Sequence, residues 1–134
     1  MHVHRLAVAL ALGAITTTLG GSGIILAQTQ LQMTQSVDRS TRTLMDSLDA
    51  ALKEYRARLS GSQRSEFDQS QRDWVAYRKT ACEFESSGLR GGSAEGMARL
   101  ICWGRYTAER LKHMQELLKC TEGDLTCPAF KVGT

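Results

Sequence analysis

The chain has 134 residues, the length of one small domain. Its 17 basic and 14 acidic residues give a net charge of only +3, and no basic run is interleaved with aromatics, so the composition argues against nucleic acid as a partner. Four cysteines in so short a chain indicate a disulfide framework if the protein is exported.

The first 27 residues have the three parts of a secretory signal peptide. Met1–Arg5 is short and basic, Leu6–Leu19 is dominated by Ala, Leu and Val, and Ala27 is a small residue suited to signal peptidase. The break at Gly20–Gly23 argues against a permanent membrane span, with an uncleaved anchor as the alternative. We therefore expect a periplasmic or secreted protein whose mature domain is residues 28–134, without stable membrane insertion.

The segment 33–59 is predicted to form the first helix of the mature domain. Its apolar residues recur at spacings of three, four and seven and occupy about a third of a helical wheel. They are Met33, Val37, Leu44, Met45, Leu48, Ala51, Leu52, Tyr55 and Leu59. Such a stripe is typical of one face of a helical bundle, with a partner-binding or membrane-surface helix as the alternative.

A short break at Ser60–Ser62 favours an antiparallel second helix over 63–86. Three polar residues at spacings of seven fall within its apolar arc, where a charge costs several kcal/mol unless it is paired. We expect them to form a structural polar network with the facing helix, and a binding site is the alternative. The network would consist of Gln71, Arg78, Glu85, Thr107 and Arg110.

The glycines of Gly88–Ser93 predict a flexible turn before a third helix over 94–119. Ser93 is a candidate N-cap, and Glu95 is favourably placed in the first helical turn. The third helix has two apolar faces and a narrow polar stripe. We therefore expect it to lie centrally and to contact both other helices.

The two arms of this helical hairpin each carry one cysteine at a similar distance from the turn. Cys82 lies nine residues before Gly91 and Cys102 ten after Gly92, so both sulfurs should sit at similar heights on antiparallel helices. This spacing predicts a Cys82–Cys102 disulfide. The remaining pairing, Cys120–Cys127, would clip the tail 120–134, whereas the competing pairing joins the tail to Cys82 or Cys102.

Residues suited to catalysis or metal binding are scarce. His113 is the only histidine after residue 27, and no acid-nucleophile motif lies beside it. Cys120 and Cys127 lack zinc-finger spacing, and Glu122 with Asp124 falls short of an EF-hand. The sequence therefore predicts no enzyme activity, no cofactor and no metal.

One set of linked motifs spans the predicted hairpin. It reads Gln71-x-x-Trp74-x-x-Tyr77-Arg78-x-x-x-Cys82, a Gly-Gly-Ser turn, Cys102, and then Thr107-x-x-Arg110 followed by a leucine. With these motifs the chain resembles the LprI-like lysozyme-inhibitor N-terminal domain family over roughly Met33 to Leu118. The family pattern often has cysteines before the first helix, whereas residues 30–36 of this chain contain none.

The resemblance implies an exported all-α three-helix bundle that inhibits lysozyme by direct protein–protein binding. The turn between the second and third helices is the candidate contact, because a guanidinium such as that of Arg90 can pair bidentately with the catalytic carboxylates of a lysozyme cleft. The candidate partner-binding residues are Leu89, Arg90, Ser93 and Glu95. As a plain helix connection, the same turn would need no partner.

Two other functions fit the same sequence. One is a periplasmic or secreted interaction module that holds an envelope or secretion-system protein through the first or third helix. The other is a cell-wall glycan binder that uses the aromatics Trp74, Trp103 and Tyr106. Solvent exposure discriminates between them. An apolar patch on the first helix favours the module, and accessible Trp103 and Tyr106 favour the glycan binder. An exposed turn with both aromatic sets buried favours the inhibitor.

Overall fold

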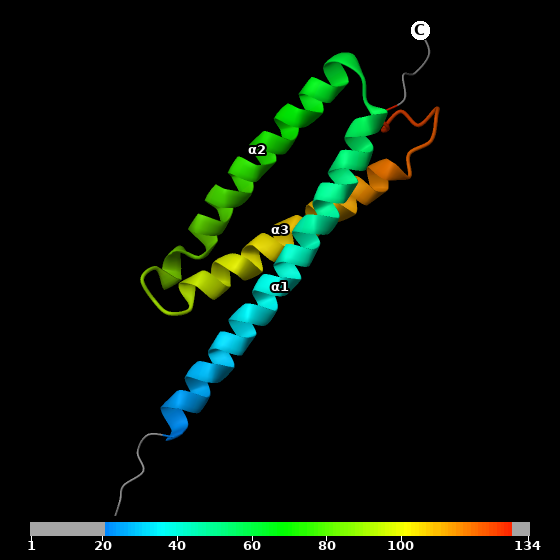
Figure 1. Ribbon diagram of the computed structural model, residues 1–134. Helices are drawn as coiled ribbons and strands as arrows, with labels where there is room; N and C mark the ends of the chain where they lie inside the picture. Colours follow the sequence, from blue (N-terminus) through cyan, green and yellow to red (C-terminus); the bar gives the residue numbers. More distant parts are fainter. Residues whose placement is uncertain (1–20, 130–134) are drawn as a thin grey trace, which may run out of the picture.

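The computed structural model describes residues 21–129, with side chains described from residue 28 (Figure 1). The element order is α1 (Gly21–Arg58), α2 (Gly61–Glu85), the 3₁₀ helix η1 (Ser87–Leu89) and α3 (Glu95–Leu118). These residues contain no β-strand. The predicted all-α, three-helix fold is therefore confirmed.

Helix α1 is longer than its apolar pattern predicts. The pattern begins at Met33, whereas the helix begins at Gly21 and continues through Ala27, the predicted cleavage point. The remainder of the predicted signal peptide, residues 1–20, lies outside the described residues. Within the described part, no helix has both the length and the hydropathy needed to span a bilayer. The signal peptide thus stays a prediction.

Helix α3 is the central helix, packed across α1 and also in contact with α2 (Figure 1). This confirms the expectation drawn from its two apolar faces. By contrast, the backbones of α1 and α2 approach each other at few points, and these two helices meet through side chains: Arg56 pairs with Asp68, and Phe67 packs on Tyr55. Gly104 of α3 lies so close to Thr41 of α1 that an added Cβ would be 3.2 Å from the threonine Oγ1. A small residue therefore permits the close approach of α1 to α3.

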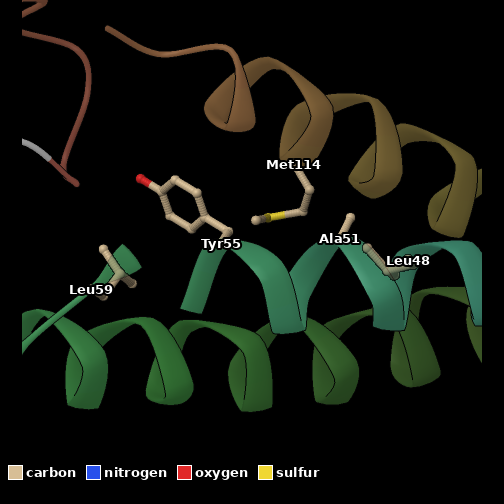
Figure 2. Close-up of a cluster of buried hydrophobic side chains, with 5 residues drawn as sticks. All are labelled: Leu48, Ala51, Tyr55, Leu59 and Met114. Atoms are coloured by element: carbon tan, nitrogen blue, oxygen red, sulfur yellow. The ribbon is translucent and has the colours of Figure 1, made fainter. Parts of the chain in front are cut away.

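The hydrophobic core lies where the C-terminal part of α1 packs on α3 (Figure 2). Its buried members are Leu48, Ala51, Tyr55, Leu59 and Met114. The first four belong to the apolar stripe predicted for this helix. Met33, from the same stripe, is 54% exposed because the N-terminal part of α1 extends beyond the other helices. The stripe is thus a core face over its second half.

Both predicted disulfides are present. Cys82–Cys102 joins α2 to α3 with the two Cα atoms 5.7 Å apart, and both cysteines are buried. Cys120–Cys127 closes the tail, and the side-chain amide of Gln63 donates a hydrogen bond to the Pro128 carbonyl. The tail is therefore attached to the start of α2.

The two bridges should differ in their contribution to stability. In the loop-closure model, a bridge across the 20-residue separation of Cys82 and Cys102 stabilises by about 3 kcal/mol. The 7-residue separation of Cys120 and Cys127 corresponds to about 2 kcal/mol. We expect the Cys82→Ala/Cys102→Ala variant to lose more free energy of unfolding in urea than the Cys120→Ala/Cys127→Ala variant. Equal losses would contradict this ranking.

Candidate functional site

The turn between α2 and α3 is hydrogen-bonded along its length, although its glycines predict a flexible connection. At the end of α2, the Ser86 hydroxyl donates to the Cys82 carbonyl at 2.8 Å. Further on, the Gly92 amide donates to the Leu89 carbonyl at 2.9 Å. Gly91 has a φ of +76°, a conformation that favours glycine. The turn therefore has a defined backbone.

Glu95 closes this turn from the α3 side. Its carboxylate accepts a hydrogen bond from the Gly91 amide at 2.8 Å and forms an ion pair with Arg99. Ser93 does not cap the helix: Ala94 occupies the N-cap position, and no side chain caps α3 there. The N-cap prediction for Ser93 is wrong, because α3 starts one residue later and the Glu95 carboxylate binds the turn backbone instead.

Two side chains of the turn are left exposed without internal partners. Leu89 is 45% exposed. The exposed guanidinium of Arg90 makes no hydrogen bond or ion pair with the described residues, a property it shares there with Arg39. Each of the other arginines of residues 28–129 has at least one such contact. The turn thus presents an apolar side chain beside an unpaired cation.

Arg78, in the second half of α2, is buried between α2 and α3. It is 8% exposed, and its Nη1 donates to the Thr107 hydroxyl at 2.8 Å. Its guanidinium carbon lies 4.7 Å from the ring centroid of Trp74 and 5.2 Å from that of Trp103. Burial lowers the pKa of Arg78, and the charge of Asp49 opposes that shift. Two aromatic faces and a hydroxyl therefore stabilise this cation.

Arg110 of α3 also lies near the Trp74 ring. Its Nε donates to the Gln71 side-chain oxygen at 3.3 Å, and its guanidinium carbon is 5.9 Å from the Trp74 centroid. Burial lowers the pKa of Arg110 as well. The structure thus brings four residues of the expected polar network, Gln71, Arg78, Thr107 and Arg110, together around Trp74.

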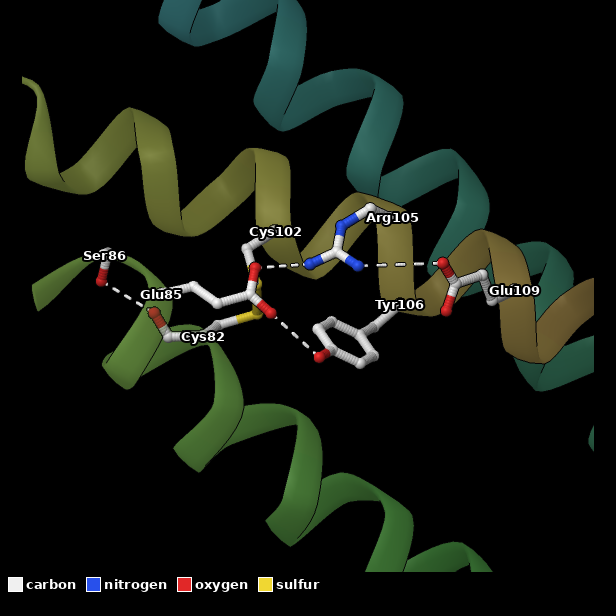
Figure 3. A network of polar contacts seen from close by, with 7 residues as sticks. All are labelled: Cys82, Glu85, Ser86, Cys102, Arg105, Tyr106 and Glu109. Atoms are coloured by element: carbon white, nitrogen blue, oxygen red, sulfur yellow. Dashed lines mark hydrogen bonds and ion pairs between the residues drawn. A yellow bond between two sulfur atoms is a disulfide. The ribbon is translucent and has the colours of Figure 1, made fainter.

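Glu85, the fifth expected member, lies elsewhere (Figure 3). It is exposed, so the expectation that it is buried is wrong. As the last residue of α2 it lies over the disulfide, where it pairs with Arg105 and accepts a hydrogen bond from the Tyr106 hydroxyl at 2.9 Å. One of its carboxylate oxygens is 3.4 Å from the Cys102 sulfur.

The sequence reasoning missed Arg105 and Tyr106 as partners of Glu85. They lie three and four residues after Cys102, about one helical turn away. Their closeness to the predicted bridge is the feature of the sequence that indicates they can reach Glu85. The hydroxyl of Tyr77 and then the hydrogen bond to Glu85 raise the pKa of Tyr106 to about 12. The Arg105 guanidinium also lies 4.6 Å from the Tyr106 ring centroid. Glu85, Arg105 and Tyr106 therefore form a polar cluster over the disulfide bridge.

In the described part of the chain, no group of His, Cys, Asp and Glu could hold a metal ion. The structure is that of a small, disulfide-bonded helical domain with an exposed turn whose backbone is hydrogen-bonded. The family model described as "Lysozyme inhibitor LprI" matches residues 26–114, and the chain belongs to this family. No curated protein and no solved structure matches the chain.

The family match includes α2, the turn and most of α3 with both hairpin cysteines, and it ends at residue 114, before the end of α3 and before Cys120. The family is one of lysozyme inhibitors, which are binding proteins and not catalysts. Its target class indicates an extracytoplasmic location, and the two disulfides are consistent with that location. The disulfide-clipped tail lies outside the matched residues.

The polar cluster over the bridge predicts a specific acid dependence of stability. Hydrogen bonds from Arg105 and then Tyr106 hold the pKa of Glu85 below its usual 4.5. Glu85 therefore contributes stability that is present above pH 4.5 and is lost as the pH falls through the lowered native value. In Glu85→Gln, the free energy of unfolding should fall less between about pH 5 and pH 3 than in the wild type.

The measurement is urea unfolding followed by circular dichroism across this pH range. Glu83→Gln is the matched control, because Glu83 is an exposed carboxylate of the same helix that lies 4.0 Å from Lys79 and does not contact Arg105 or Tyr106. We expect it to keep the wild-type profile. Identical profiles for Glu85→Gln and the wild type would show that the cluster is not coupled to folding.

Proposed function

We propose that the protein inhibits lysozyme by binding it directly, with the turn between α2 and α3 as the contact. The family match supports the inhibitor class. The observation that carries the placement is the exposed guanidinium of Arg90, which has no partner among the described residues and lies on a hydrogen-bonded turn. The adjacent Cys82–Cys102 bridge fixes the base of that turn.

The chemistry of the turn fits the cleft of a glycosidase. Such clefts hold two carboxyl groups, and a guanidinium can pair with a carboxylate through two parallel hydrogen bonds. Arg90 has no ion pair to break before it binds, unlike Glu95, whose carboxylate is already bound to Gly91 and Arg99. Because the backbone is already ordered, binding loses less conformational entropy. Leu89 would add apolar contact beside the cation, and Ser93 a polar one.

Exposure favours this placement over glycan binding. The turn is exposed, whereas Trp74, Trp103 and Tyr106 are partly buried in the bundle. A glycan platform needs open aromatic faces, and Arg78 lies over the rings of Trp74 and Trp103. The predicted signal peptide would deliver the inhibitor to the compartment in which lysozyme acts.

One observation favours a second function. The N-terminal part of α1 extends beyond the other helices (Figure 1), and within it Leu31 is 58% and Met33 54% exposed. Two exposed apolar side chains on an overhanging helix suit an interaction module that holds an envelope protein. The turn and the N-terminal part of α1 are separate segments, so variants of each can be compared in one inhibition assay.

The turn is tested by Arg90→Glu/Leu89→Ser, which replaces the cation and its apolar neighbour. We expect inhibition of cell-wall lysis to weaken by about tenfold or more across the lysozyme types that the wild type inhibits. The matched control is Arg39→Glu/Leu31→Ser, which makes the same chemical changes at an unpaired arginine and an exposed leucine of α1. The control should inhibit like the wild type.

Three other outcomes are informative. Full inhibition by the turn variant would rule out the turn as the contact. Loss of inhibition in the α1 variant alone would place the contact on α1. If the oxidised protein, shown by circular dichroism to be helical, inhibits no lysozyme type, the interaction module becomes the better function.

A further inference from the structure

The second half of α2 has an uncharged side that faces away from α3. Arg78 and Cys82 contact α3, and a residue two positions away from either lies about 160° around the helix axis. The side opposite α3 therefore consists of exposed residues, which we call the outer face: Ala76, Tyr77, Thr80 and Phe84. The exposed side of a surface helix is usually charged or polar. This one has no charge, although α2 lies along one edge of the molecule (Figure 1).

Two aromatic side chains dominate the outer face. Phe84 is 79% exposed, more than any other aromatic residue in the described part of the chain, and Tyr77 is 58% exposed. They are seven residues apart, so they lie on the same side of the helix, about 10 Å from each other along its axis. The Tyr77 ring packs edge-on against Tyr106 with 5.7 Å between the ring centroids, which holds it in place. An aligned aromatic pair on an uncharged face indicates a contact surface, whereas single exposed apolar residues are common.

Opposite charges stand at the two ends of the outer face. Asp73 is exposed and lies on the same side of α2, four residues before Tyr77. Its carboxylate accepts a hydrogen bond from the Gln69 side chain and forms no ion pair with the described residues. At the other end, just beyond α2, stands the exposed guanidinium of Arg90, which has no such partner either. The aromatic pair thus lies between an unpaired carboxylate and an unpaired guanidinium.

We propose that the outer face of α2 binds the same face of a second copy of this chain, in an antiparallel dimer with two-fold symmetry. Tyr77 of each copy would lie against Phe84 of the other. The same register brings Asp73 of each copy toward Arg90 of the other, because both pairs have their midpoint at residues 80–82. The symmetry forms every contact twice.

The order of the charges selects both the occupant and its direction. A parallel pairing would set Asp73 against Asp73 and Arg90 against Arg90, and both contacts are repulsive. In the antiparallel pairing each charge meets its opposite, so the face is complementary to itself. Ala76 and Thr80 are small, which lets the two helices approach closely enough for the aromatic rings to meet.

The size of the contact indicates a weak, reversible dimer. Residues 73–85 span about 18 Å of helix, whereas a standard interface buries about 800 Å² on each partner. We therefore expect a dissociation constant on the order of 100 μM. The dimer goes beyond the proposed function and does not rest on it. Because it would cover Arg90, inhibition of lysozyme would belong to the monomer, which predominates at micromolar concentrations.

The test is sedimentation equilibrium of the oxidised protein at low salt, from about 10 μM to about 1 mM. We expect a monomer–dimer equilibrium in the wild type and a dissociation constant at least about tenfold higher in Phe84→Ser. Leu125→Ser is the matched control, because it removes an apolar side chain that is 82% exposed in the tail. It should associate like the wild type. The changed residues are exposed, so circular dichroism should show the helix content of the wild type in each variant.

A charge exchange tests the direction of the pairing. Asp73→Arg and Arg90→Asp each replace two attractions by two repulsions, and each should raise the dissociation constant about tenfold. The double variant Asp73→Arg/Arg90→Asp restores opposite charges and should dimerise like the wild type. It still lacks the cation of the turn, so it should inhibit lysozyme weakly. If it dimerises and also inhibits fully, the dimer stands and the proposed inhibitory contact fails.

Three results would overturn the dimer. The first is a wild type that stays monomeric at the highest concentration. The second is a Phe84→Ser variant that dimerises normally. The third is a double variant that associates no better than the single ones.

Discussion

The covalent bond between Cys82 and Cys102 determines where the C-terminal end of α2 lies against α3. The N-terminal half of α2 is held differently, by the Arg56–Asp68 ion pair with α1 and by the packing of Phe67 on Tyr55. The fully buried residues of α2, Arg78 and Cys82, both contact α3. The bridge and the contacts of Arg78 with Trp103 and Thr107 hold this end of α2 against α3, and they thereby fix the position of the turn. The position of the turn thus depends on the oxidised state of the hairpin.

Much of the fold could be predicted from the sequence because it depends on period and spacing. The 3.6-residue period of the apolar stripe marks Leu48 and Tyr55 as core residues. Similar distances from the glycine turn, nine and ten residues, place Cys82 and Cys102 at similar heights. Both inferences use geometry within one helix or one hairpin, which the order of residues determines directly.

What could not be predicted depends on where neighbouring helices end. Met33 has the right period, yet it is exposed because α1 extends past its neighbours. Glu85 has the spacing of a buried residue, yet it stands at the last residue of α2, where Arg105 reaches it. The hollow lined by Arg110 and Leu117 is partly formed by Pro128 of the tail, and the residues of the tail follow no helical period from which this could be predicted. The helical period of a sequence shows which face of a helix a residue lies on. It does not show how far along the helix a neighbouring helix covers that face.

The central place of α3 has a consequence for the order in which the molecule assembles. Helix α3 is synthesised last, yet it supplies Met114 to the core and Cys102 to the hairpin bridge. Until it emerges, the apolar stripe of α1 can pack only on side chains of α2 such as Phe67, and its core cluster lacks Met114. The growing chain should therefore remain loosely structured until synthesis is nearly complete. Late closure of this kind would keep a polypeptide unfolded enough to be threaded through a narrow channel before it compacts.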